Sequence, residues 1–362
     1  MPSLKLLADD LTGALDTSAE FVGACGPLDV VWSAESLASV QASFAIDSGT
    51  RECGADEAAA IMRGLAPRLD RADIAYKKID SLMRGPWVAE LEACLQSGLW
   101  DACIVAPAFP HQGRITRAGR QYARIPDGSW SAAGPAIIEQ LRGRDLEARL
   151  AGRKSALQRG ISVFDAERDD DLDGIAEVGR NFSGRLLWCG SGGLAAALAR
   201  GTDVSVPAQL KTPLLGIFGS DHAATAAQLS LCEALVLRTY DIRENIEEIR
   251  RALDRAVALV RLETAGVVSR AEAAQHFARE VARLAQAIDV PKTLLIAGGE
   301  TLKAQMLAVG ARALRVVGRL EPGLPKSVIQ GGRWAGVDVI SKSGAFGPPE
   351  LWFSLLRQNR LM

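Results

Sequence analysis

Two short segments place charged side chains where strand-like runs end. In LLADDLTGALD, Asp9 and Asp10 follow the first apolar run of the chain, and in YKKIDSLMRGP a strand-like run contains Lys78 and Asp80. The last two are two positions apart, so they share one face of a strand. A lysine in a strand covered on both faces needs an anionic partner, because an unpaired buried charge is costly. These residues predict a polar site for a small polyhydroxy acid.

Two arginines accompany these residues. Arg51 lies just beyond another strand end in AIDSGTRE, and Arg84 follows the second segment directly. A guanidinium group can hold a carboxylate through two parallel hydrogen bonds. We therefore expect both arginines at the same site. Structural alternatives stay open: the charges could form a salt-bridge network within the protein, and one aspartate could cap the following helix.

Glycine turns follow strand-like runs in the second half of the chain. GIFGSDHAAT contains Ser220, LLIAGGETLK contains residues 298–301, and SKSGAFG contains Lys342 and Gly344. Backbone amides in such turns can approach phosphate oxygens closely, so the turns together predict a nucleotide site. The motifs G-x-x-x-x-G-K-[ST], H-E-x-x-H and G-x-S-x-G are absent, which argues against P-loop NTPases, zincins and α/β-hydrolases.

A further glycine-rich segment, CGSGGLAAALA, matches the dinucleotide pattern G-x-G-x-x-A at residues 190–195. In NAD-dependent enzymes an acidic residue follows about 20 positions later, whereas the region near residue 210 reads PAQLKTPLLG. An NAD-dependent hydroxy-acid oxidoreductase is therefore one alternative function, although the acidic residue expected after the glycines is missing. A non-catalytic ligand-binding protein is the other. We expect these glycines to allow close packing of a helix on a strand.

The elements that must position these residues alternate between strand-like and helical patterns. This alternation predicts two α/β domains, each with a mostly parallel sheet flanked by helices. The segment GTDVSVPAQLKTP at residues 201–213 interrupts the rhythm, so we place the domains at residues 1–205 and 206–362. After the strand-like run DACIVAPA we expect a long polar loop and then a helix.

Composition narrows the range of partners. The 362 residues carry a formal net charge of −1, with 48% hydrophobic and 23% charged residues. This balance gives no support for nucleic acid as a partner, and no apolar run approaches the length of a membrane span. The six cysteines are scattered and no signal peptide is evident, so we expect a cytoplasmic protein. A homodimer is an assembly that the sequence leaves open.

Seven segments, in order, resemble those of the four-carbon acid sugar kinases: LLADDLTGALD, KKIDSLMRGP, APAFPHQGR, CGSGGLAAALA, GIFGSDHAAT, IAGGETL and SKSGAFG. These are ATP-dependent kinases of threonate, erythronate and 3-oxo-tetronate, and the resemblance spans nearly the whole chain. It implies an N-terminal acid-sugar-binding domain, a C-terminal ATP-binding domain and an active site in the cleft between them. Phosphoryl transfer from ATP also needs Mg²⁺, whose protein ligands stay unassigned.

The resemblance implies roles for individual residues. Substrate contacts are implied for Asp9, Asp10, Arg51, Lys78, Asp80 and Arg84. ATP contacts are implied for Ser220, Gly298, Gly299, Glu300, Thr301 and Gly344. We expect Asp10, with Asp80 as second choice, to accept the proton of the attacking hydroxyl group. Two departures from the family pattern, Leu82 in place of threonine and His222 in place of serine, leave the particular acid open.

Overall fold

The chain folds into two compact units. The computed structural model describes residues 1–33, 36, 42–125, 127–152, 155–202, 204–219, 222–264, 266 and 269–362. The first unit comprises Met1–Trp32 and Ser39–Val204, and Ser205–Met362 make up the bulk of the second. We call them the N-terminal and C-terminal units and describe each by itself.

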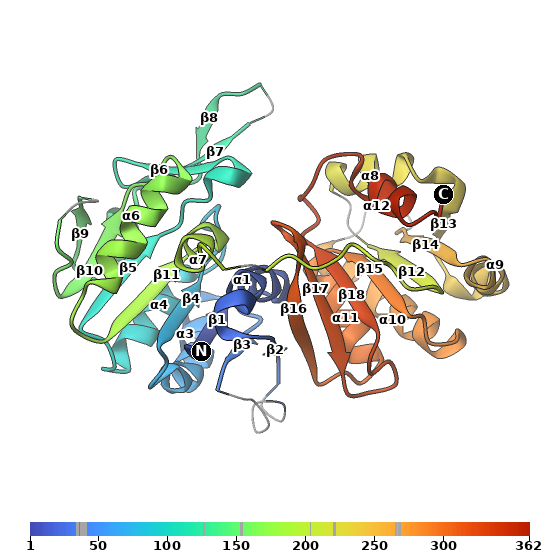
Figure 1. Cartoon of the computed structure of the whole chain (residues 1–362), viewed down its shortest axis with the longest axis horizontal. Coiled ribbons are helices and arrows are strands. Elements are labelled where there is room, and N and C mark those ends of the chain that lie inside the picture. Colours follow the sequence, from blue (N-terminus) through green and yellow to red (C-terminus); the bar gives the residue numbers. More distant parts are fainter. Residues whose placement is uncertain are drawn as a thin grey trace. The chain divides into compact units, whose positions relative to one another are not determined.

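The N-terminal unit is built on a parallel sheet, of which eight strands lie in the described residues (Figure 1). Their order across the sheet is β2 (Leu28–Val31), β3 (Phe44–Asp47), β1 (Leu4–Ala8), β4 (Ile74–Lys78), β11 (Leu186–Gly190), β5 (Ala102–Ala106), β10 (Gly160–Phe164) and β9 (Ala148–Ala151). The pairs between these strands are parallel. Strand β5, with the sequence ACIVA, is buried throughout. Such continuous apolar runs are typical of parallel strands covered on both faces.

Helices cover both faces of this sheet. They are α1 (Leu11–Cys25), α3 (Ala55–Leu65), α4 (Trp87–Gln96), α5 (Ile137–Arg142), α6 (Asp169–Arg180) and α7 (Gly192–Leu198), with 3₁₀ turns η1 (Ala66–Leu69) and η2 (Pro110–Gln112). Helices α1 and α6 both contact α7, whereas α3 contacts α4. In β4 the side chain of Lys78 lies beside Gly13 of α1, and that of Lys77 pairs with Glu90 of α4. Helices α1 and α4 therefore cover opposite faces.

Three strands that follow η2 form a small separate antiparallel sheet (Figure 1). Its strands are β6 (Arg114–Arg117), β7 (Arg120–Arg124) and β8 (Trp130–Ala132). Our expectation of a long polar loop was wrong for this segment, although helix α5 does follow it. The strands pair locally through a tight turn in which Ala118 has φ 49° and Gly119 has φ 69°. Their side chains are mostly polar or exposed, so the sequence shows no apolar pattern from which these strands could be predicted.

The C-terminal unit has a mixed sheet, mostly parallel (Figure 1). The described strand order is β13 (Val236–Thr239), β14 (Val257–Leu262), β12 (Leu214–Phe218), β15 (Thr293–Ala297), β18 (Asp338–Lys342), β17 (Leu324–Gln330) and β16 (Ala313–Glu321). The first five are parallel, and β17 is antiparallel to both β18 and β16. Strands β12, β15 and β18 are buried along their whole length.

Helices flank this sheet as well. They are α8 (Ala223–Ser230), α9 (Ile242–Asp254), α10 (Arg270–Ala287), α11 (Gly299–Ala308) and α12 (Leu351–Gln358), with the 3₁₀ turn η3 (Glu233–Leu235). Leu229 of α8 and Trp352 of α12 share one apolar cluster with Phe218 of β12, Leu295 of β15 and Ile340 of β18. Figure 1 shows α10 and α11 on the other side of these strands. The predicted class, α/β with mostly parallel sheets flanked by helices, is confirmed for both units.

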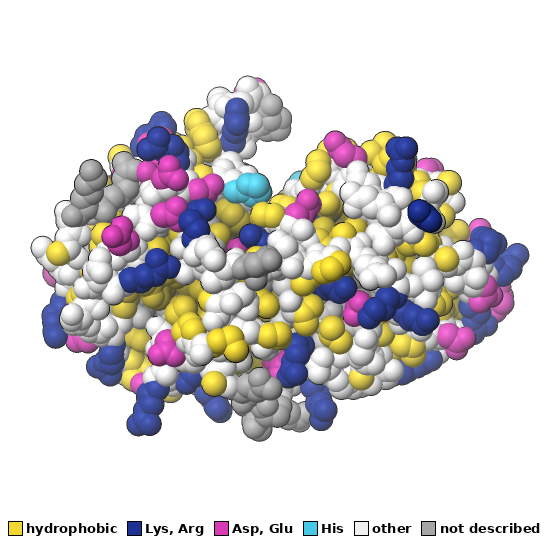
Figure 2. Space-filling model, viewed as in Figure 1, with side chains coloured by type: hydrophobic (Ala, Val, Ile, Leu, Met, Phe, Trp, Pro, Cys, Tyr) yellow, Lys and Arg dark blue, Asp and Glu magenta, His cyan; other side chains and the backbone are white. Residues whose placement is uncertain are grey.

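The visible surface of both units carries mixed charge. Figure 2 shows lysine and arginine interspersed with aspartate and glutamate, without an extended area of one sign on this face. Within the described residues, we find no helix long and apolar enough to cross a membrane.

Candidate active site

The carboxyl ends of β1, β3 and β4 bring the predicted acid-binding residues together. Strand β1 lies between β3 and β4 in the sheet. Asp9 follows β1, Arg51 follows β3 and Asp80 follows β4. The helices that follow β1 and β4 leave toward opposite faces of the sheet. A switch of this kind opens a crevice at the carboxyl edge of an α/β sheet, where ligands bind. The topology thus explains why residues far apart in the sequence meet.

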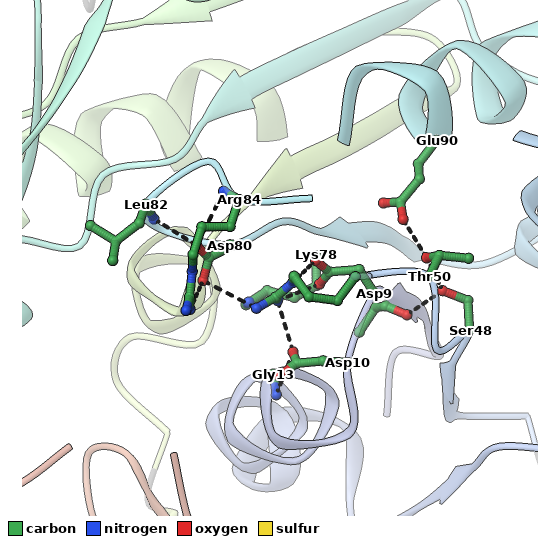
Figure 3. Close-up of polar contacts among 12 residues, drawn as sticks. Asp9, Asp10, Gly13, Ser48, Thr50, Lys78, Asp80, Leu82, Arg84 and Glu90 are labelled. Atoms are coloured by element: carbon green, nitrogen blue, oxygen red, sulfur yellow. Dashed lines mark hydrogen bonds and ion pairs between the residues drawn. The ribbon is translucent and has the colours of Figure 1, made fainter. Parts of the chain in front are cut away.

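Arg51 is the centre of the cluster, since it contacts Asp9, Asp10 and Asp80. Figure 3 shows these three carboxylates. The Nε and Nη2 atoms of Arg51 donate to both carboxylate oxygens of Asp9, with an Nη2–Oδ1 distance of 2.7 Å. Nη2 also donates to Oδ1 of Asp10 at 2.9 Å, and Nη1 contacts Oδ1 of Asp80 at 3.4 Å. The salt-bridge network that the sequence left open is therefore present, and one guanidinium holds three carboxylates in a fixed arrangement.

Burial and charge oppose each other at these carboxylates. Burial alone raises the pKa of Asp9, but the hydrogen bond and positive charge of Arg51 outweigh it and hold the pKa below its usual value. At Asp80, burial again raises the pKa, and the hydrogen bond from Arg84 and the charge of Arg51 lower it well below the usual range. Both groups are therefore ionised at neutral pH.

Asp10 both caps helix α1 and faces the cluster. Its side chain accepts a hydrogen bond from the backbone N–H of Gly13 at 3.0 Å and from the hydroxyl of Thr12 at 2.7 Å. A side chain at position 13 would collide with Asp10 and lie 3.0 Å from Nζ of Lys78, so only glycine fits there. The side chain of Asp10 is 26% exposed, compared with 9% for Asp80, and it is the more accessible acid.

Asp80 is occupied by the loop that follows it. Oδ2 accepts hydrogen bonds from the backbone N–H groups of Leu82 and Arg84, both at 3.2 Å, and from Nε of Arg84 at 2.7 Å. Oδ1 accepts from Nη2 of Arg84 at 2.8 Å. These bonds leave Asp80 well suited to orient Arg84 and poorly suited to take up a proton. The side chain of Arg84 is 64% exposed, so a ligand can reach its guanidinium group while Asp80 holds it in place.

Lys78 differs from its neighbours because its charge is not neutralised by direct contact. It is 6% exposed, and its Nζ makes no hydrogen bond or ion pair with the described part of the chain. Its positive charge nevertheless helps to lower the pKa values of Asp9 and Asp80. Figure 3 shows it among the carboxylates. A buried ammonium group without its own counterion is a natural binding point for a ligand carboxylate.

Sequence reasoning missed the support beneath this site. Lys77, fully buried on the opposite face of β4, forms an ion pair with Oε2 of Glu90 at 2.7 Å. Thr50 donates a hydrogen bond to Oε1 of the same glutamate, and Thr50 and Ser48 share a hydrogen bond of 2.7 Å. The Lys77–Glu90 ion pair thus holds, through Thr50, the loop that carries Arg51. A signal was present, because Glu90 lies on the otherwise apolar face of the helical segment WVAELEACLQ.

The C-terminal unit presents a second edge of the same kind. Strands β12, β15 and β18 are neighbours, and Gly219, Gly298 and Gly344 follow their carboxyl ends. Gly298 begins α11 with φ +100°, a conformation that favours glycine. A side chain on Gly219 would come within 2.8 Å of Oγ1 of Thr301. Gly219 therefore allows the end of β12 to pack closely against α11, and the positive φ of Gly298 forms the turn before that helix.

The remaining predicted nucleotide residues surround this edge. Gly299, Glu300 and Thr301 form the first turn of α11, whose N–H groups lack partners within the helix and suit an anion. Gly344 accepts a hydrogen bond through its carbonyl from Oγ1 of Thr225 at 2.9 Å. Ser220 lies outside the described residues. The N–H groups of the first turn of α11 suit a phosphate group.

A metal ion would have few protein ligands there. Groups of three or more His, Cys, Asp or Glu side chains that could hold a metal do not occur among the residues that the structure describes. Mg²⁺ bound with a nucleotide uses one or two carboxylates, and phosphate oxygens and waters complete its shell. Glu300, exposed on the first turn of α11, is a carboxylate of this kind. The donor set therefore fits Mg²⁺ held mainly by phosphates.

The dinucleotide-like turn at residues 190–193 is filled by protein. A side chain on Gly190 would lie 2.6 Å from the carbonyl oxygen of Ala106, and one on Gly193 would lie 2.5 Å from that of Ala108. Ser191 is fully buried, donates to the Ala108 carbonyl at 2.7 Å and caps α7 through the N–H of Gly193. These glycines allow α7 to pack closely on the loop after β5.

A cavity of about 540 Å³ lies apart from the charged cluster, between η2 and the small antiparallel sheet. Its lining consists of Pro110, His111, Gln112, Gly113, Ile115, Arg124, Ile125, Trp130 and Glu167. None of the predicted site residues lines it.

Comparisons with known proteins identify the family. Residues 4–137 match the model of a sugar-binding N-terminal domain, and residues 215–351 match that of a nucleotide-binding C-terminal domain. A D-threonate kinase of Bordetella bronchiseptica is 31% identical over 391 aligned positions, covering 97% of this chain and 96% of that protein. The chain belongs to the four-carbon acid sugar kinases.

Further relatives agree with this assignment. A D-threonate kinase of Cupriavidus necator is 29% identical to this sugar-acid kinase, with 95% of each chain covered. Solved structures from Salmonella typhimurium and Haemophilus influenzae share its fold, with TM-scores of 0.75 and 0.71 at 19% identity and with 99% of this chain and 100% of each solved chain covered. The kinase is thus a phosphotransferase that acts on an alcohol group, and the oxidoreductase and non-catalytic alternatives are set aside.

Proposed function

We propose that this kinase transfers the γ-phosphoryl group of ATP to a hydroxyl group of a four-carbon sugar acid, with D-threonate as the first candidate. The observation that carries the proposal is the largely buried cluster of three carboxylates, with Arg51, Lys78 and the more exposed Arg84, at the carboxyl edge of the N-terminal sheet. D-threonate is the acid named for the curated relatives from Bordetella bronchiseptica and Cupriavidus necator. A sugar acid matches the cluster, since it has one carboxylate and several hydroxyl groups.

The substrate carboxylate binds Lys78 and Arg84. Lys78 supports this role because its buried charge has no direct partner among the described residues, and Arg84 because its side chain is largely exposed. Arg51 is committed to Asp9, Asp10 and Asp80, so it orients the acids that receive the substrate hydroxyl groups. Charge-assisted hydrogen bonds of this kind are the strong ones in protein sites.

Asp10 accepts the proton of the attacking hydroxyl group. It is the most exposed of the three carboxylates, and its position at the start of α1 fixes its direction. Asp80 is the second choice from the sequence. It is less suited to accept the proton, because Arg84 and two backbone N–H groups already donate hydrogen bonds to its carboxylate. A positioned general base contributes about 100- to 10,000-fold to a proton-transfer step.

The C-terminal unit binds the nucleotide at the edge formed by Gly219, Gly298 and Gly344. The first turn of α11, with Gly299 and Thr301, contacts the phosphates, and Glu300 would hold Mg²⁺ together with them. Bound Mg²⁺ neutralises charge on the phosphate oxygens. The placement of the reaction in a cleft between the units stays a prediction.

The proposal is tested by incubating the purified protein with Mg-ATP and a panel of acids, and following ADP release. The panel contains both enantiomers of threonate and of erythronate, and 3-oxo-tetronate. We expect release with at least one acid, and a loss of about 100-fold in kcat/KM, mainly through KM, for Lys78→Met. Lys292→Met, which changes an exposed lysine, is the matched control. The absence of ADP release with every acid would refute the proposal.

A further inference from the structure

Lys342 is a buried lysine whose charge has no anionic partner in the described part of the chain. It ends β18 and is 1% exposed. Its Nζ donates to the backbone carbonyls of Ser343 and Gly344, at 3.1 and 3.3 Å, and contacts Oγ1 of Thr225 at 3.5 Å. All three acceptors are neutral.

Two other lysines with little exposure are paired with carboxylates. Lys77 is as deeply buried but lies 2.7 Å from Glu90. Lys326 on the neighbouring strand β17 lies 3.3 Å from Asp338, which Lys211 also contacts at 3.0 Å. Each of these lysines thus contacts a carboxylate, whereas the acceptors that Lys342 contacts are neutral. Lys78, at the proposed acid site, is the other buried lysine without a direct ion pair to a described residue.

The position of Lys342 relates it to the glycine edge. Lys342 is opposite Ala297 in the β15–β18 pair, and its carbonyl accepts the N–H of Gly298 at 3.0 Å. Its side chain points to the face covered by α8, since Ile340, two residues before it, belongs to the cluster packed under α8 and α12. Helix α8, AATAAQLS, carries no acidic residue. The backbone of Lys342 therefore adjoins the turn that starts α11, while its side chain lies on the α8 face among neutral neighbours.

The loop after Lys342 is held in place from α8. Gln228 donates from Nε2 to the carbonyls of Phe346 and Gly347, at 3.0 and 3.1 Å, and Thr225 donates to Gly344. Of the two carbonyls bonded to the ammonium group, that of Gly344 is thus held directly by α8, and Gln228 holds the loop that follows. A preorganised cation of this kind is a cost to the ligand-free protein, because burial of an unpaired charge is unfavourable. Burial accordingly lowers the pKa of Lys342 to about 8.

We propose that Lys342 is a phosphate-binding residue, which holds a phosphate group of the nucleotide at the carboxyl edge of β18. This inference rests on the proposed function and adds to it a charged side chain, which the glycine residues of the turns do not supply. The ammonium group of a lysine acts as a point charge toward phosphate oxygens. A bound phosphate group would be the counterion that Lys342 lacks in the ligand-free protein. Its binding would therefore offset the free-energy cost of the buried, unpaired charge.

Calorimetric titration of the unmodified protein with Mg-ATP, Mg-ADP and adenosine, without acid substrate, comes first. Failure of the unmodified protein to bind ATP would count against the proposed function itself. The same ligands are then titrated into Lys342→Met and Lys342→Gln, the second of which keeps a hydrogen-bond donor without the charge. We expect ATP affinity to fall by about 10- to 100-fold in both, while adenosine affinity stays unchanged.

The control variant is Lys326→Met, which removes a lysine from the adjacent strand and leaves Lys211 on Asp338. It should bind ATP like the unmodified protein. Melting temperatures separate a structural role from a binding role: a phosphate-binding Lys342 can be replaced with little loss, because a buried charge is removed. Unchanged ATP affinity in the Lys342 variants, or an equal loss for adenosine and ATP, would overturn the inference while leaving the proposed function standing.

Discussion

At the scale of single residues, the site depends on how each buried charge is neutralised. Arg51 contacts three carboxylates and is itself 13% exposed, so its removal would leave Asp9 buried without its main counterion. Breaking a buried ion pair from one side costs about 3–5 kcal/mol, because the remaining charge stays desolvated. Lys77 and Lys78 offset only part of this loss, since their charges contribute less to the pKa of Asp9 than Arg51 does.

Replacement of Arg51 should therefore reverse the pH dependence of stability. In the unmodified protein the pKa of Asp9 lies below its unfolded value, so its contribution to stability is present above about pH 4 and is lost at lower pH. In Arg51→Met, burial raises this pKa, and stability should fall as pH rises from about 4 to 7. Native-state hydrogen exchange of the β1 amides between pH 4.5 and 7 measures the effect.

The double variant Arg51→Met with Asp9→Asn is the control for this prediction. It has no titrating group at position 9, so the pH dependence should disappear although the fold is still weakened. Equal losses of stability at pH 4.5 and pH 7 in the single variant would show that Asp9 is not held by Arg51 in the way its contacts indicate.

At the scale of elements, one residue begins a helix and also serves the chemistry. Asp10 caps α1 through the N–H of Gly13 and presents a carboxylate oxygen to Arg51. Asparagine is as good a cap as aspartate, whereas alanine is a poor one. The two functions of Asp10 can therefore be separated by substitution.

We expect Asp10→Asn to lower kcat by at least 100-fold with little change in KM or melting temperature, since the cap survives and the proton acceptor is lost. Asp10→Ala should show the same loss of kcat and an additional loss of about 1 kcal/mol in stability. Steady-state ADP release and urea unfolding measure the two effects. A normal kcat in Asp10→Asn would transfer the role of base to another group and contradict the assignment.

The elements also show what sequence could and could not predict. Apolar runs bounded by glycine and acidic residues predicted the parallel strands. The positions of Asp9, Arg51 and Asp80 at or just beyond strand ends predicted that they lie at one site. The strands β6, β7 and β8 escaped prediction because their pairing is local and their side chains are largely polar. The pairing of Lys77 with Glu90 escaped because it depends on how α4 packs on β4, which no short sequence pattern records.

At the scale of the whole molecule, each unit repeats the same topological arrangement. In the N-terminal unit β1 lies between strands β3 and β4, and in the C-terminal unit β12 lies between β14 and β15. Each unit also has its own buried core. The residues of the proposed acid site belong to one unit and those of the proposed nucleotide site to the other. Among the described residues, the buried lysine of each unit without a direct ion pair, Lys78 or Lys342, lies at the end of a strand.

This arrangement predicts that each ligand alone protects its own unit from hydrogen exchange. D-threonate should slow exchange at the ends of β1 and β4, and Mg-ATP at the start of α11 and after β18, because each ligand binds only the folded form of its unit. At 100 times its Kd a ligand adds about 2.7 kcal/mol to stability, enough to slow exchange about 100-fold where amides exchange through unfolding.

The lysine variants provide the internal control for this experiment. Lys78→Met should abolish protection by D-threonate and leave protection by Mg-ATP intact, and Lys342→Met should do the reverse. This crossed pattern requires that each lysine serve its own ligand, since a general loss of stability would change exchange without regard to ligand. Protection of the N-terminal unit by Mg-ATP alone would contradict the assignment of the nucleotide to the C-terminal unit.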